Sequence, residues 1–137
     1  MKKPDLFQYD LSRFNPRVVE GYQRYLAIAM KFPGMEEAIL HDTPAIKLNG
    51  KTISRWRVES DGALAILCDF AGRELLLKAK PGVFFINEHY KETPGVLVHL
   101  EKVRADALEE VVERAWRSVA NKKLIKQYDE AVKIVGK

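Results

Sequence analysis

Apolar side chains recur at the spacing of an α-helix in three long segments of the chain. The first follows Asn15-Pro16, which favours a helix start because asparagine caps the first turn and proline fits the first helical position. Pro33-Gly34 ends this segment. The other two segments span residues 104–120 and 122–135, and each has charged residues on its opposite face. The pattern predicts three amphipathic helices.

Between these helices, short apolar runs predict β-strands at residues 38–40, 45–48, 52–58 and 63–69. Asn49-Gly50 lies between the second and third runs, and both residues tolerate the positive φ of a type I′ turn. Asp61-Gly62 is predicted to form a second turn of this kind. Sequential strands joined by tight turns predict an antiparallel meander.

The remaining segments complete a predicted α+β fold. Residues 72–79 favour a helix, and residues 83–86 and 95–100 favour strands separated by a loop over residues 87–94. One antiparallel sheet with helices packed on one face buries every apolar stripe. We therefore expect a single domain over residues 1–137, with an N-terminal strap (1–15) and a basic C-terminal helix (122–137).

The composition of the chain indicates what class of protein it is. Hydrophobic residues make up 47% and charged residues 31%, which is enough apolar side chain for a core. The longest apolar runs are too short to cross a bilayer, and no signal-peptide pattern follows Met1. Cys68 is the single cysteine, so no intrachain disulfide can form and a reducing compartment is expected. These features predict a cytoplasmic protein that does not contact membranes.

Positive charge is concentrated at the two ends of the chain. The formal net charge is +4, and residues 117–137 contain six basic residues and two acidic ones. Residues 1–35 contain six basic residues and three acidic ones, so the middle of the chain is slightly negative. Basic ends can meet phosphate or an acidic partner, and they can equally serve solubility.

Two groups of basic residues are candidates for phosphate contacts. Arg55 and Arg57 alternate along one predicted strand, so they share a face while Trp56 points to the other side. Lys47 and Lys51 flank the neighbouring hairpin turn, and the tail helix carries Lys122, Lys123 and Lys126. A solvated strand and an ordinary basic helix face also explain these patterns. The nucleic-acid hypothesis is a binding module that contacts the phosphates of double-stranded DNA with low sequence selectivity.

Two other functions are consistent with the sequence. In the first, His89 and Tyr90 in the loop over residues 87–94 belong to a small-ligand or enzyme pocket. In the second, the tail helix over residues 122–137 is a protein–protein adaptor. No HExxH, CxxC, GxSxG or glycine-rich phosphate loop is present, so we predict no catalytic residue, metal site or cofactor.

From about residue 16 to residue 121, several short stretches occur in an order and spacing that form one pattern. They are Phe32-Pro33-Gly34, Glu36-Glu37, the stretch 44–51, the stretch 81–85, His89-Tyr90, the stretch 96–100, and Leu108, Ala115 and Trp116. In these residues the chain resembles the MmcQ/YjbR family of small bacterial proteins. The resemblance implies an α+β fold similar to the frataxin-like sheet and to a double-wing module. It also implies DNA binding, the function predicted for that family by likeness of fold.

Overall fold

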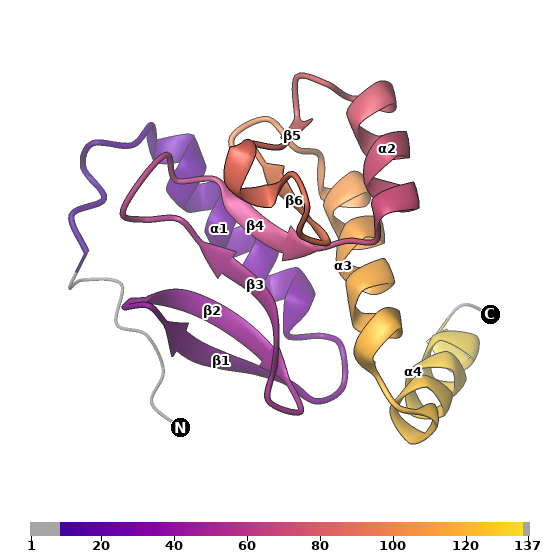
Figure 1. Ribbon diagram of the computed structural model, residues 1–137. Helices are drawn as coiled ribbons and strands as arrows, with labels where there is room; N and C mark the ends of the chain where they lie inside the picture. Colours follow the sequence, from indigo (N-terminus) through magenta and orange to yellow (C-terminus); the bar gives the residue numbers. More distant parts are fainter. Residues whose placement is uncertain (1–8, 136–137) are drawn as a thin grey trace.

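The structure, a computed structural model, describes residues 9–135 and contains four helices and six strands in that range (Figure 1). The helices are α1 (Pro16–Ala29), α2 (Phe70–Ala79), α3 (Ala105–Val119) and α4 (Lys122–Val135), with a short 3-10 helix η2 (Glu88–Tyr90). The strands are β1 (Met35–Leu40), β2 (Thr43–Leu48), β3 (Lys51–Trp56), β4 (Leu64–Leu67), β5 (Phe84–Phe85) and β6 (Gly95–Val98). The predicted α+β class is confirmed.

The six strands form one antiparallel sheet with the order β1-β2-β3-β4-β6-β5. The predicted meander is confirmed for β1 to β4, which pair in chain order. β6 then pairs with β4, and β5 adds to the outer edge of β6. The connection from β4 to β5 therefore contains α2, and the connection from β5 to β6 contains η2.

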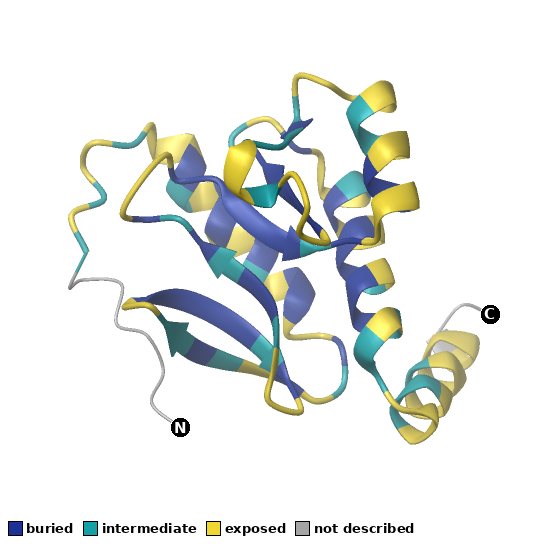
Figure 2. Ribbon diagram, in the orientation of Figure 1, coloured by how far each residue is buried: buried dark blue, intermediate teal, exposed yellow. Residues whose placement is uncertain are grey.

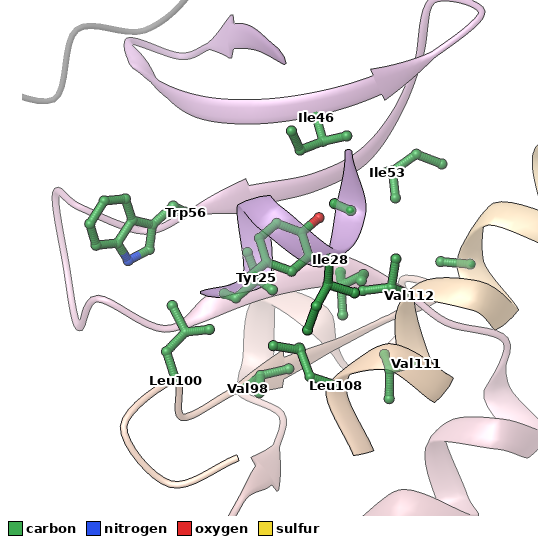
Figure 3. Packing of buried hydrophobic residues seen from close by; sticks show 14 of the residues in the cluster. Tyr25, Ile28, Ile46, Ile53, Trp56, Val98, Leu100, Leu108, Val111 and Val112 are labelled. Atoms are coloured by element: carbon green, nitrogen blue, oxygen red, sulfur yellow. The ribbon is translucent and has the colours of Figure 1, made fainter. Parts of the chain in front are cut away.

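Helices α1 and α3 cover one face of the sheet and build the core with it (Figures 1 and 3). The ring of Trp56 stacks on the ring of Tyr22 in α1, with 4.0 Å between the centroids. Leu108 and Val112 of α3 are fully buried in the same cluster. Leu76 and Leu77 of α2 pack against it from the side of β5 and β6. Figure 2 shows β2 and β4 mostly in dark blue, because nearly all of their residues are buried.

The turns show where local sequence signals determine backbone geometry. Asn15 caps α1, since its Oδ1 accepts a hydrogen bond of 2.9 Å from the backbone N–H of Arg17. Asn49 and Gly50 have φ values of 51° and 80°, as the predicted type I′ turn requires.

Two details of the strand prediction were wrong. At Asp61-Gly62 only Gly62 has a positive φ, and the Asp61 carboxylate instead accepts a hydrogen bond from the Ala63 N–H. β1 begins at Met35 and not at residue 38, because Glu36 and Glu37 pair with β2 although they interrupt the apolar pattern. The turn between β1 and β2 was not predicted. It places His41 and Asp42 at φ values of 50° and 59°, conformations that side chains other than glycine rarely adopt.

The two ends of the described chain are attached to the domain. In the predicted N-terminal strap, residues 1–8 lie outside the described part, while Phe14 packs on Gly62 and Arg13 donates a hydrogen bond to the Val58 carbonyl. At the other end, Tyr128 of α4 stacks on Phe32 with centroids 4.9 Å apart. Within residues 9–135, none of the helices is long and apolar enough to span a bilayer.

We predict that Gly21→Ala destabilises the domain. A Cβ atom at position 21 of α1 would lie 2.4 Å from the backbone carbonyl oxygen of Leu100. Because a backbone atom cannot move away without disturbing the sheet, the overpacking should cost about 2 kcal/mol, although alanine favours helices. Urea unfolding measures the change. Gly82→Ala is the control, since no atom lies within 4 Å of a Cβ there; equal stability of the two variants would contradict the packing.

Candidate functional site

On the face of the sheet opposite α1 and α3, side chains from neighbouring strands form a row. The side chain at the centre of this row is small. Strand register aligns Ala45 of β2, Arg55 of β3, Ala65 of β4, Leu97 of β6 and Phe85 of β5. Because alternate residues of a strand point to opposite faces, these five side chains lie side by side on the open face. The methyl group of Ala65 fills little space, which leaves the surface hollow beside Arg55.

The segment that contains η2 folds over one end of this row and forms a wall. The ring of Tyr90 packs against a second apolar cluster that contains Ala63, Ala65 and Leu97. Gly95 lies beside this ring, since a Cβ at position 95 would be in ordinary contact with it at 3.4 Å. The Arg57 guanidinium lies 5.9 Å from the centroid of the same ring. Tyr90 therefore packs against the open face of the sheet.

The wall, the open strands and the β1–β2 turn together enclose a hollow of about 350 Å³ that is open to solvent. Its floor is formed by β3 and β4, and His41 and His89 come from the turn and from η2. The lining residues are Leu40, His41, Thr52, Ile53, Ser54, Arg55, Ala65, Ile66, Leu67, His89, Tyr90, Thr93, Pro94 and Gly95. The structure thus places both predicted pocket residues, His89 and Tyr90, at one concave site.

A buried arginine holds this wall in place. Arg73 lies in the first turn of α2, and its Nη1 donates hydrogen bonds to the carbonyl oxygens of Tyr90, Thr93 and Gly95 at 2.8, 2.9 and 3.1 Å. Nη2 donates to the carbonyl of Lys91 at 2.8 Å. Among the described residues no carboxylate pairs with Arg73, and its buried Nε has no hydrogen-bond partner. Four carbonyl dipoles replace water around the cation, which fixes the backbone of residues 90–95.

The sequence prediction missed Arg73, since one arginine in an apolar helix looks like an ordinary solvated residue. The signal that could have found it is in the loop. A turn that ends in Thr93, Pro94 and Gly95 leaves carbonyl groups that neither strand can satisfy, and buried carbonyl groups need donors. Loop sequence indicates that a donor is needed, but it does not indicate which residue supplies it.

The two arginines predicted to contact phosphate share the open face, as expected, but each is paired with a carboxylate. Arg55 Nη1 lies 3.0 Å from both carboxylate oxygens of Glu59. Arg57 Nε lies 3.1 Å from Asp61 Oδ1. Both guanidinium groups are half-buried, and their charge is partly neutralised within the domain.

The predicted lysines lie at a different edge of the domain. Gly34 contacts both Leu48 of the β2–β3 hairpin and Leu124 of α4, so the hairpin tip and the start of α4 are neighbours. Lys51 is exposed at this tip, while half-buried Lys47 lies opposite Glu36 in the sheet. At α4, Lys122, Lys123 and Lys126 are exposed, and Lys126 Nζ is 4.0 Å from Glu130. The β2–β3 hairpin and the start of α4 therefore lie near each other, on either side of Gly34.

A second hollow of about 390 Å³ lies between α2 and α3 and contains Cys68. Burial raises the pKa of the Cys68 thiol, which disfavours the reactive thiolate and agrees with an inert core cysteine. At its rim, a hydrogen bond from Arg114 holds the pKa of Asp69 below its usual range. The other lining residues combine aliphatic side chains with three charged ones, Lys80, Asp106 and Glu110. Among the described residues, no group of three or more His, Cys, Asp or Glu side chains could hold a metal ion.

Comparison with known proteins relates the chain to a fold but to no described activity. No protein-family model matches it. Two uncharacterised mycobacterial proteins, Mb2600 of Mycobacterium bovis and Rv2570 of Mycobacterium tuberculosis, are each 36% identical to it over 53 residues. The match covers 39% of this chain, and the chain spans only 41% of the length of these curated relatives.

A solved structure shares the architecture. The crystal structure of Deinococcus radiodurans protein DR2400, which has a DUF419 domain, aligns with a TM-score of 0.60 over 74% of this chain and 82% of that protein. The two sequences are 20% identical over the alignment. This likeness shows that both proteins have the same small α+β fold, and it assigns no ligand.

We predict that Arg73→Met lowers the free energy of unfolding by about 3 kcal/mol, because four part-buried or buried carbonyl groups lose Arg73 as a donor. Urea denaturation measures the loss. Arg114→Met is the matched control, since its ion pair with Asp69 is exposed and such pairs contribute little. If the two substitutions have equally small effects, Arg73 does not organise the wall.

Proposed function

We propose that this protein binds a small molecule in the hollow on the open face of its sheet. The observation that carries the proposal is that Arg55, His89 and Tyr90 line one concave site, whose floor on β3 and β4 includes Ala65. A binding site of this kind combines an apolar surface with a few convergent polar groups. The Arg73 hydrogen bonds support it further, because a preformed wall reduces the entropy lost when a ligand binds.

The proposal predicts a specific binding map. In a fragment screen followed by ¹H–¹⁵N correlation spectra, binding fragments should shift the amides of Thr52, Ala65 and Thr93, which line the hollow. Ala65→Leu should weaken such binding roughly tenfold or more, because the larger side chain fills the floor. Ala27→Leu, on the exposed side of α1, is the control and should bind as the wild type does.

Fragment shifts confined to the hollow between α2 and α3 would contradict this assignment. So would binding that survives Ala65→Leu in a variant whose spectrum shows an intact fold. The geometry supports a binding role, and we assign no residue to catalysis.

The second candidate function is binding of double-stranded DNA, with membership of the MmcQ/YjbR family. The order of the family-like motifs and the small α+β fold that the chain shares with the DUF419 domain support it. One structural observation also favours it, namely that Gly34 contacts both Leu48 and Leu124, so the hairpin that carries Lys51 lies near the start of the helix that carries Lys122 and Lys123. A surface built from residues far apart in the chain could follow a phosphate backbone.

Fluorescence anisotropy with labelled duplex DNA at two salt concentrations tests this candidate. Replacing Lys51 and Lys123 together by Gln should weaken binding equally for different sequences and reduce the salt slope by roughly two. Replacing Arg55 and Arg57 together should have a smaller effect, because their ion pairs with Glu59 and Asp61 partly neutralise their charge. Absence of binding at low salt, or an affinity that does not change with salt, would exclude it.

A further inference from the structure

The residues that line the hollow on the open face provide positive charge and hydrogen-bond donors. Among the described residues, none of those that line it is acidic. Arg55 carries a permanent charge, and the imidazoles of His41 and His89 each keep at least one N–H donor in either protonation state. Thr52 and Thr93 add hydroxyl groups. The electrostatic potential of such a wall favours an anion and disfavours a cation.

The Arg55 guanidinium has an edge that forms no hydrogen bond to any residue in the range 9–135. Its Nη1 donates to both oxygens of Glu59 and lies 3.4 Å from Thr43 Oγ1. Glu59 is absent from the lining of the hollow, so it approaches Arg55 from outside. In the part of the chain that the structure describes, Nε and Nη2 have no acceptor. These two N–H groups match the spacing of two oxygens of a carboxylate or phosphate.

The rest of the hollow is suited to a compact apolar group. Its floor includes Ile53, Ala65 and Leu67, and Tyr90 provides a ring at the wall. A flat group that lies on Ala65 would cover apolar surface without displacing any side chain that the core needs. The polar and apolar parts of the hollow are thus adjacent.

From these contacts we infer that the ligand is a small molecule with one carboxylate or phosphate group joined to a flat apolar body. The acidic group binds the Nε–Nη2 edge of Arg55, and the apolar body covers Ala65 beside Tyr90. This inference rests on the proposed function, since it names the class of ligand for the same site.

Three probes of one shape test the inference: 2-naphthoate, 2-naphthyl phosphate and the uncharged 2-naphthamide. Each is titrated into the full chain, and the shifts of the lining amides give its affinity. We expect at least one of the two anions to bind roughly tenfold more tightly than the amide, as is typical of charge-assisted hydrogen bonds. The relative affinity of naphthoate and naphthyl phosphate identifies the acidic group.

Variants of Arg55 and of a second ion-paired arginine assign the preference to a residue. Arg55→Gln should abolish the difference between anion and amide, and Arg55→Lys should retain only part of it, because lysine keeps the charge without the planar fork. Arg114→Gln is the matched control: Arg114 is paired with Asp69 and does not line the hollow, so the preference should persist.

Each of the remaining outcomes contradicts one stated part of the proposal. If the amide binds as tightly as the anions and shifts the lining residues, the anion class is wrong while the proposed function stands. If the preference survives Arg55→Gln, or is lost equally in Arg114→Gln, the assignment to Arg55 is wrong. If no probe and no screened fragment shifts the lining amides, the proposed function itself fails.

Discussion

The hydrogen bonds of Arg73 to the backbone of residues 90–95 are the interaction on which the candidate site depends. Without them, the segment between β5 and β6 would leave carbonyl groups unsatisfied beside the sheet. A buried cation without a carboxylate partner is costly unless several dipoles surround it. The cation and the loop therefore stabilise each other, and the loop becomes a fixed wall.

The two faces of the sheet have different roles. On one face, large side chains such as Trp56 and Leu64 pack against α1 and α3 and provide most of the stability. On the other face, the small side chain of Ala65 leaves room for the hollow, and half-buried Arg55 remains beside it. Because one strand provides both faces through simple alternation, the site is as rigid as the core beneath it.

Local signals in the sequence predicted most of the fold. Asn15-Pro16 begins α1 and Asn49-Gly50 forms the hairpin turn, because in each case a few adjacent residues determine the backbone. The pocket prediction named His89 and Tyr90, which the structure places in one hollow. It could not name Arg73 or His41, since both reach the site through tertiary contacts. Likewise, the pairing of Arg55 with Glu59 depends on how the chain after β3 turns back, and no pattern along the strand indicates it.

Hydrogen exchange at the amides of Tyr90 and Thr93 tests the central claim most directly. Both N–H groups donate to backbone carbonyls within the wall, at 3.1 Å and 3.2 Å. If Arg73 fixes this segment, these amides exchange slowly in the wild type and lose protection in Arg73→Met, while amides of the paired strands β4 and β6 stay protected. Fast exchange of Tyr90 and Thr93 in the wild type, or equal protection in the variant, would contradict the account.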